Sequence, residues 1–188
     1  MKKILIAEDE SIIRMDLRIL LENHGYHVIA EANNGEKAIE LAFEHKPDLI
    51  LMDIKMPKID GLKASKIIGE QLDLPIIIIT AYSQKEFVEK AQQDNVIGYL
   101  VKPIAEANLI PAVEVAIHQF QKTKQLKANI VAVEAEVEKR KLIERAKGIL
   151  MDSKNISEKE AFKMLRDNSM SRQMAMDVLA KEIIELNK

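Results

Sequence analysis

The chain has 188 residues, of which 47% are hydrophobic, and a formal net charge of −2. This length and composition can bury one sizeable core and a smaller second one. The absence of cysteine excludes a disulfide framework and thiolate metal sites. The apolar run near the N-terminus is broken at Glu8, too early for a signal peptide, and no run approaches transmembrane length. We therefore expect a cytoplasmic protein with no membrane partner.

Charge and composition divide the chain into two parts. Residues 1–122 hold 14 Lys and Arg against 19 Asp and Glu, a net charge of −5, whereas residues 123–188 hold 14 against 11, a net charge of +3. All five prolines also precede residue 112. We interpret these differences as two units, a mixed α/β domain over residues 2–121 and an all-helical domain over residues 122–186.

Apolar runs typical of strands alternate with helical patterns in the first unit. In chain order, we predict a strand at Lys3–Ala7, a helix at Ser11–His24, a strand at Tyr26–Ala30, a helix opened by Asn34-Gly35, a strand at Leu49–Met52, a helix at Gly61–Glu70, a strand at Pro75–Thr80, a helix at Gln84–Gln92, a strand at Gly98–Val101 and a long helix from Glu106. The first helix has an apolar face of Ile12, Ile13, Leu17, Leu20 and Leu21 and is expected to stop at Gly25. Five strands that alternate with five helices predict a parallel, doubly wound, flavodoxin-like sheet.

The second unit shows helical patterns only. A coiled-coil seam with four-three-four spacing runs through Leu126, Ile130, Val133 and Val137. Ser157 and Glu160 have the spacing of a capping box. The helix after this box is expected to turn inward Ala161, Phe162 and Leu165. Ser171 is expected to cap a last helix that turns inward Met174, Val178 and Ile184. These patterns predict a coiled-coil linker helix followed by a small three-helix bundle.

Polar side chains follow four of the predicted strands. Glu8-Asp9 comes after the first strand, Asp53 after the third, Thr80 at the end of the fourth and Lys102 after the fifth. These four strands can be neighbours in a doubly wound sheet, where their carboxyl ends meet at one edge. Each residue alone has a simpler explanation, as a helix cap, a turn or a solvated lysine. Their joint placement favours a single pocket.

The residue types in this pocket suit phosphoryl transfer. Clustered carboxylates repel one another unless a cation lies between them, and Mg²⁺ is the natural hard cation for a few carboxylates, a carbonyl and waters. Asp53 can then act as a nucleophile toward a phosphoryl group. Lys102 supplies a point charge for phosphoryl oxygens, and Thr80 supplies a hydroxyl. Such chemistry requires little beyond positioning and charge neutralisation.

Residues 2–121 resemble the receiver domain of two-component response regulators. The matching motifs are Glu8-Asp9, Asp53 with Met56-Pro57 and Asp60-Gly61, Thr80-Ala81, and Tyr99-Leu100-Val101-Lys102-Pro103. The resemblance implies that Asp53 is the phosphoacceptor and that Mg²⁺ is held by Glu8, Asp9, Asp53 and the backbone carbonyl of Lys55. It also implies phosphoryl contacts from Thr80 and Lys102, an inward turn of Tyr99 on activation, and a cis peptide bond before Pro103.

The second unit resembles the ANTAR domain, the three-helix RNA-binding domain of AmiR- and NasR-like antitermination regulators. The matching segments are Ile143 to Met151, Ala161-Phe162 with Leu165-Arg166, and Ser169-Met170-Ser171. A net charge of +3 suits phosphate binding. Aromatic residues are scarce and Phe162 is expected in the core, so we do not expect bases to stack on aromatic platforms. The candidate RNA contacts are Lys147, Lys163, Arg166 and Arg172.

Together, the two resemblances imply a regulator rather than an enzyme. A sensor histidine kinase would donate the phosphoryl group, and the chain, a monomer before phosphorylation and a homodimer after it, would bind hairpins in nascent leader RNA and prevent a terminator from forming. It looks most similar to antiterminators of ethanolamine utilisation. Two alternatives remain open. A helix-turn-helix that reads duplex DNA also fits a short helix pair, whereas a haloacid-dehalogenase-type phosphatase needs a second acid where this chain has Lys55.

Overall fold

The computed structural model describes residues 1–81 and 95–187, so the predicted helix at Gln84–Gln92 lies outside the described residues. The chain divides into two compact units, Met1–Lys124 and Gln125–Lys188. The boundary that we predicted, after residue 121, lies a few residues earlier. None of the helices in the described ranges is both long and apolar enough to span a bilayer.

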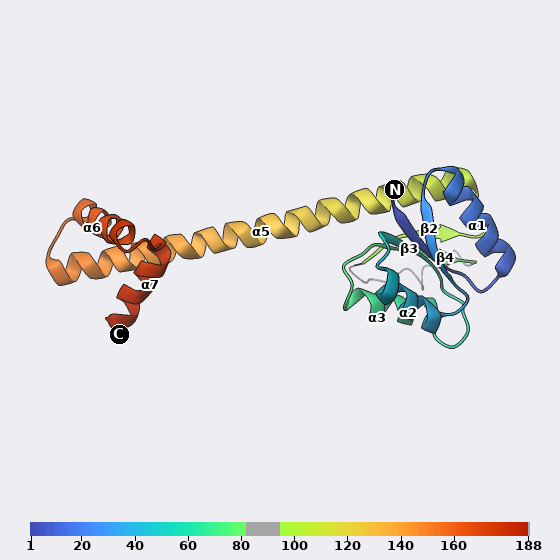
Figure 1. Ribbon diagram of the computed structural model, residues 1–188, viewed down its shortest axis with the longest axis horizontal. Helices are drawn as coiled ribbons and strands as arrows, with labels where there is room; N and C mark the ends of the chain where they lie inside the picture. The colour runs from blue at the N-terminus through green and yellow to red at the C-terminus, as the bar shows by residue number, and fades with distance from the viewer. Residues whose placement is uncertain (82–94, 188) are drawn as a thin grey trace. The chain divides into compact units, whose positions relative to one another are not determined.

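The first unit is built on a five-stranded sheet with the order β2-β1-β3-β4-β5 (Figure 1). Every neighbouring pair is parallel, as predicted. The elements are β1 Lys3–Ala7, α1 Ser11–Asn23, β2 His27–Ala32, α2 Gly35–His45, β3 Leu49–Asp53, α3 Gly61–Gly69, β4 Ile76–Thr80 and β5 Val96–Val101. β2 extends past its predicted end because Glu31 and Ala32 still pair with β1.

The two faces of the sheet bury different helices, because successive side chains of a strand point to opposite faces. Ile4, Ile6, Leu49 and Leu51 pack with Leu17 and Leu21 of α1 and with Leu109 and Val113 of α5. Leu5, Ala7, Ile50 and Met52 pack with Ala38 and Leu41 of α2 and with Ala64 and Ile68 of α3. Figure 1 shows α2 and α3 on the side of the sheet away from α1. One predicted core residue is wrong: Ile12, at the first turn of α1, is 71% exposed.

Short turns fix the loops at the carboxyl edge of the sheet. Asn34 caps α2 by accepting a hydrogen bond from the backbone of Lys37. Asp60 caps α3 in the same way, and Gly61 follows it. A Cβ atom at Gly61 would clash with the backbone carbonyl of Asp53. The start of α3 can therefore approach the end of β3 closely only with glycine at this position.

Helix α5 runs from Glu106 to Lys154, and its last turns belong to the core of the second unit. There it packs with α6, Glu158–Ser171, and α7, Met176–Leu186 (Figure 1). The capping box is confirmed: Ser157 and Glu160 each bond the backbone of the other. The core of this bundle consists of Ala146, Leu150, Ala161, Leu165, Leu179, Ala180 and Ile184.

Three predictions for the bundle are wrong. Phe162 is 42% exposed rather than in the core, and Val178 is also exposed. Ser171 does not cap the last helix, because α6 continues to Ser171 and α7 begins later, after Ala175. The Ser171 hydroxyl donates instead to the Asn168 carbonyl within α6. In a short helix pair, the apolar residues outnumber the inward positions, so pattern alone does not select among them.

Candidate functional site

Four strand ends meet at one edge of the sheet, as the sequence predicted. Asp53 ends β3 and Thr80 ends β4, while Glu8 and Asp9 directly follow β1 and Lys102 directly follows β5. The strand order places β1, β3, β4 and β5 side by side. A pocket of about 270 Å³ lies at this edge and is lined by Asp9, Glu10, Asp53, Ile54, Lys55, Thr80, Ala81 and Lys102.

The acidic side chains form a tight cluster at this pocket. Glu8, Asp9 and Asp53 each offer a carboxylate oxygen, and these oxygens lie within 4.8 Å of one another. Glu8 and Asp53 are buried, whereas Asp9 is exposed. Three carboxylates at such a distance suit a small hard cation with some remaining water ligands. The donor set therefore fits Mg²⁺.

Lys102 joins the two buried carboxylates of the cluster. Its Nζ lies 2.8 Å from Glu8 Oε2 and 3.1 Å from Asp53 Oδ2, and the side chain is 13% exposed. Burial raises the pKa of both carboxyl groups above their usual values, and the contacts with Lys102 only partly oppose it. Burial lowers the pKa of Lys102, but the hydrogen bonds to Glu8 and Asp53 outweigh this and raise it. Lys102 is therefore held in its protonated form, while burial disfavours the ionised forms of Glu8 and Asp53.

The other receiver residues named from the sequence lie in different surroundings. Thr80 is buried and lines the pocket beside Asp53. Lys55 lines it as well, and its backbone N–H donates to Asp53, which favours the ionised carboxylate. Tyr99 is half-buried against the core of the α2 and α3 face, and burial raises the pKa of its phenol. The Lys102–Pro103 peptide bond is cis, as the resemblance implied.

Two residues at this site were missed by sequence reasoning. Glu10 lies on the pocket rim, with Oε1 3.6 Å from Lys102 Nζ. Arg14 donates from Nη1 to the backbone carbonyl of Glu8 at 2.7 Å. The available signal was position: Arg14 lies in the first turn of the helix that follows the acidic loop. A side chain there can reach back toward the loop.

The four candidate RNA contacts differ in their surroundings. Lys147 is 7% exposed, and its Nζ lies 2.9 Å from Glu144 and 2.7 Å from Glu158. The same ammonium lies 5.9 Å from the centre of the Phe162 ring. These contacts join α5 to α6, so we assign Lys147 to the structure of the bundle. The exposed Phe162 ring gains a partner that the sequence did not indicate.

The remaining candidates lie on or beside α6. Arg172, the residue after α6, is half-exposed and pairs with Glu182 at 2.8 Å. Lys163 and Arg166 are exposed, and no ion pair is found for either among the described residues. Lys159, one turn before Lys163, shares these properties. The spacing of Lys159, Lys163 and Arg166 puts them on one face of α6, opposite the buried Ala161 and Leu165. We call these three residues the α6 basic face.

Comparisons with known proteins match both units. The family model of the response regulator receiver domain matches residues 4–114, and that of the ANTAR domain matches residues 132–184. The transcriptional regulatory protein PdtaR of Mycobacterium tuberculosis is 41% identical over 184 residues, which cover 98% of this chain and 90% of the relative. The chemotaxis protein CheY of Bacillus subtilis is 39% identical over 113 residues, 59% of this chain and 93% of the relative.

A solved structure supports the fold of the first unit. The signal receiver domain of a modulated diguanylate cyclase from Desulfovibrio desulfuricans G20 superposes with a TM-score of 0.61 at 35% identity, over 65% of this chain and 98% of that one. The expected likeness to antiterminators of ethanolamine utilisation stays a prediction. The carboxylate cluster, the paired lysine and the match along nearly the whole of PdtaR lead to one conclusion: the chain belongs to the response regulators and joins a receiver domain to an ANTAR domain.

Proposed function

We propose that the chain is a phosphorylation-activated antiterminator that binds hairpins in nascent leader RNA. The observation that carries the proposal is the pairing of a buried Asp53 carboxylate with Lys102 beside two further acids, in a chain that also has an ANTAR domain. A sensor histidine kinase donates the phosphoryl group. The chain acts in the cytoplasm, where leader RNA is transcribed, and it does not turn over a substrate of its own.

Asp53 accepts the phosphoryl group in this proposal. An oxygen of its carboxylate forms the new bond to phosphorus as the bond to the donor nitrogen breaks. Glu8, Asp9, Asp53 and the Lys55 carbonyl would hold Mg²⁺, which would offset the charge of the carboxylates and of the phosphoryl oxygens. Lys102 and Thr80 then contact two of the phosphoryl oxygens. The 3.1 Å contact between Lys102 and Asp53 supports this role, because the ammonium already lies beside the nucleophile.

Phosphorylation places a group with roughly two negative charges at Asp53, and Thr80 moves toward it. Tyr99 turns into the space that Thr80 leaves and changes the surface of the receiver. Receiver surfaces then pair. The seam of Leu126, Ile130, Val133 and Val137 supports this step, because all four side chains are about half-exposed along α5. One short seam is weak alone, but paired receivers raise its effective concentration.

RNA binding is assigned to the α6 basic face, Lys159, Lys163 and Arg166, with Arg172 beside it. Cations that are not already paired lose less when they contact phosphates, because no internal ion pair must break first. A dimer presents two such faces to two hairpins on one RNA. Duplex DNA remains the alternative ligand, since a helix with exposed arginine can also enter a major groove.

Two experiments test the proposal. The first is labelling of the full chain with acetyl phosphate in Mg²⁺, followed by intact-mass spectrometry. Asp53→Asn is expected to remain unlabelled, whereas Asp60→Asn, which keeps a capping side chain at the start of α3, is expected to be labelled like the wild type. A phosphoryl adduct on Asp53→Asn would contradict the assignment.

The second experiment separates the two nucleic acid ligands. Labelled hairpin RNA bound to the phosphorylated chain is challenged with unlabelled hairpin RNA or with duplex DNA of equal length at one salt concentration. We expect only the RNA competitor to displace the probe. Equal displacement by the duplex would support a DNA-binding regulator instead.

A further inference from the structure

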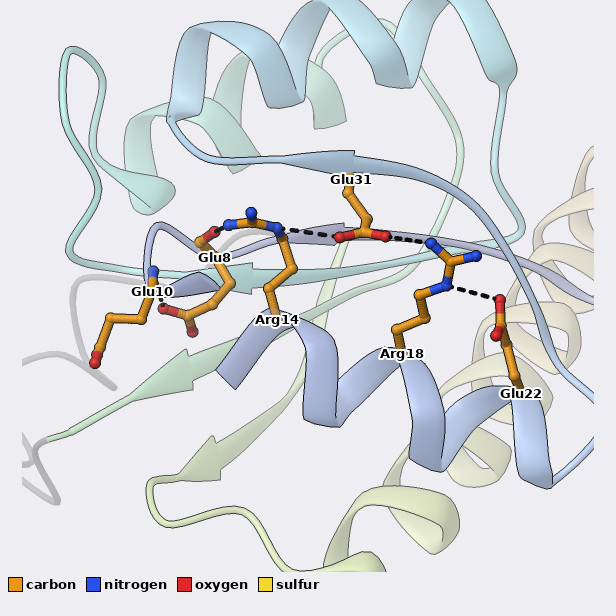
Figure 2. Close-up of polar contacts among 6 residues, drawn as sticks. All are labelled: Glu8, Glu10, Arg14, Arg18, Glu22 and Glu31. Atoms are coloured by element: carbon orange, nitrogen blue, oxygen red, sulfur yellow. Dashed lines mark hydrogen bonds and ion pairs between the residues drawn. The ribbon is translucent and has the colours of Figure 1, made fainter. Parts of the chain in front are cut away.

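Two hydrogen bonds hold the backbone of Glu8, one on the peptide before it and one on the peptide that leads into Asp9. The Glu8 N–H donates to the Ala32 carbonyl at 3.0 Å, which ties the loop to the end of β2. The Glu8 carbonyl accepts from Arg14 Nη1 at 2.7 Å, which ties it to α1 (Figure 2). The Ala32 bond therefore fixes the peptide before Glu8, and the Arg14 bond fixes the peptide that leads into Asp9. Of these two bonds, the one from Arg14 is made by a side chain and can therefore be removed by substitution.

Asp9 depends on this anchoring more than the other two acids of the cluster do. Glu8 and Asp53 are buried and are held by Lys102 at 2.8 Å and 3.1 Å. Asp9 is exposed, and no ion pair of its carboxylate is found within residues 1–81 and 95–187. Its carboxylate nonetheless lies within 4.8 Å of those of Glu8 and Asp53. The position of this carboxylate therefore depends more on the backbone before Asp9 than the positions of the Glu8 and Asp53 carboxylates do, because Lys102 holds those two.

Arg14 is itself held in place by a chain of alternating charges. Its Nε donates to Glu31 Oε2 at 3.1 Å, and the other oxygen of Glu31 accepts from Arg18 Nη1 at 2.9 Å. Arg18 Nε in turn donates to Glu22 at 3.0 Å. Figure 2 shows this row running along α1, with Glu31 reaching down from β2. Charge-assisted bonds of this kind fix a planar guanidinium in one orientation.

Glu31 has a second effect on the acidic site. An unpaired guanidinium close to the Glu8–Asp9 loop would repel a divalent cation. The carboxylate of Glu31 lies against Arg14 on the side away from Glu8 and offsets its charge. Arg14 can therefore act through the geometry of its hydrogen bond rather than through its charge.

We propose that Arg14 is a positioning residue for divalent cation binding, which holds the Glu8–Asp9 peptide so that Asp9 faces Glu8 and Asp53. This inference rests on the proposed Mg²⁺ site. Arg14 touches neither the cation nor the phosphoryl group. Loss of such an outer contact weakens metal affinity at other protein sites by roughly 10- to 100-fold, and a similar loss is expected here.

Arg18 supplies the matched control. It lies one turn further along α1 and binds the same Glu31, but in the described part of the chain its hydrogen bonds go to Glu31 and Glu22 rather than to Glu8. The affinity of the full chain for Mg²⁺ is measured by isothermal titration calorimetry and by the rise of the Tm with Mg²⁺ concentration. Arg14→Ala is expected to weaken binding at least roughly tenfold. Arg18→Ala keeps the bonds of Arg14 to Glu8 and Glu31 and is expected to bind like the wild type.

A kinetic readout separates positioning from general stability. At saturating Mg²⁺, labelling of Arg14→Ala by acetyl phosphate is expected to regain most of the wild-type rate, so that the change lies in the Mg²⁺ concentration at half-maximal rate. Arg14→Lys is expected to resemble Arg14→Ala, because one ammonium nitrogen cannot replace the two nitrogens that bind Glu8 and Glu31. Full recovery of Mg²⁺ affinity by lysine would overturn the geometric role.

The outcomes distinguish this inference from the proposed site. If the wild type itself does not bind Mg²⁺, the metal site is wrong and the role of Arg14 falls with it. If the wild type binds Mg²⁺ and Arg14→Ala matches Arg18→Ala in affinity, only the role of Arg14 is overturned. A lower Tm for both variants with unchanged affinity would likewise assign the arginines to stability alone.

Discussion

The Nζ atom of Lys102 lies 3.1 Å from a carboxylate oxygen of Asp53, and both side chains are nearly buried. The same ammonium contacts Glu8 at 2.8 Å, so one cation faces two buried carboxylates. The cluster keeps a net negative charge, which Asp9 increases. A buried site of this charge is costly to the fold and attracts a divalent cation. Several properties of the chain should follow from this imbalance.

Replacement of Lys102 is expected to destabilise the receiver and slow its phosphorylation. Lys102→Ala leaves two buried carboxylates without their counter-charge, which costs about 3 kcal/mol when one partner of a buried pair is removed. Lys63→Ala removes an exposed ion pair with Asp60 and is expected to cost less than about 1 kcal/mol. Urea unfolding at neutral pH measures both values. Equal stability of the two variants would contradict the buried pairing.

The pH dependence of stability should reveal the raised pKa of Asp53. Because the folded chain holds this proton more tightly than the unfolded chain, the free energy of unfolding falls as pH rises through the raised pKa. In the presence of a chelator, Asp53→Asn is therefore expected to be more stable than the wild type at neutral pH. The difference should close as pH falls toward about 4, the ordinary range of carboxyl groups. A wild type that is the more stable at neutral pH would show that Lys102 outweighs burial.

The contribution of each cation on or beside the α6 basic face to RNA binding is expected to depend on whether the cation is already held in an ion pair. Arg166→Ala is expected to weaken hairpin binding by roughly 1–3 kcal/mol, if the guanidinium contacts a guanine edge. Arg172→Ala should cost less, because Arg172 must first leave Glu182. Lys163→Ala is expected to lower the salt dependence by about one phosphate contact. Lys181→Ala, an exposed cation on α7, serves as the control. Equal losses for all four variants would indicate general electrostatic attraction without a defined face.

The exposed seam on α5 is expected to contribute to dimerisation only after phosphorylation. Val133→Glu places a charge in the middle of the seam and should prevent the phosphorylated chain from dimerising, while the unphosphorylated chain stays a monomer. Sedimentation velocity with and without acetyl phosphate measures both states. Lys127→Glu, a change of charge at another exposed position on the same helix, is the comparison. A stable dimer of the unphosphorylated wild type would rule out this switch.

Most of the receiver fold could be predicted because its signals are local and repeated. The apolar runs at Leu49–Asp53 and Ile76–Thr80 are buried on every residue, and each ends in a polar group. Parallel strands then bring those ends to one edge, whatever the details of the loops. Asp53, Thr80 and Lys102 could be placed together from this rule alone. The prediction also assumed that the first, third, fourth and fifth strands are neighbours, and the observed order β2-β1-β3-β4-β5 confirms this.

The remaining features depend on contacts between segments that pattern does not encode. From the sequence, Arg14 is expected to be an exposed arginine on a helix. Its hydrogen bond to the Glu8 carbonyl depends on the turn between β1 and α1, which the pattern does not encode. From the sequence, Lys147 is expected to be an exposed cation in a basic unit, but its ammonium forms ion pairs with Glu144 and Glu158. From its residue type, Phe162 is expected in the core, but Ala161 and Leu165 occupy the inner face of α6. Residue type predicts burial poorly where a small bundle has few inward positions.

The affinity of the full chain for RNA, with and without phosphorylation at Asp53, tests the central claim most directly. The probe is a stem-loop RNA enriched from a random library on the phosphorylated wild type, and fluorescence anisotropy gives its Kd. Wild type treated with acetyl phosphate and Mg²⁺ is expected to bind at least roughly tenfold more tightly than untreated wild type, a difference of about 1.4 kcal/mol. Asp53→Asn treated in the same way is expected to bind like the untreated chain. Equal affinity of the treated and untreated wild type would contradict control of RNA binding by phosphorylation.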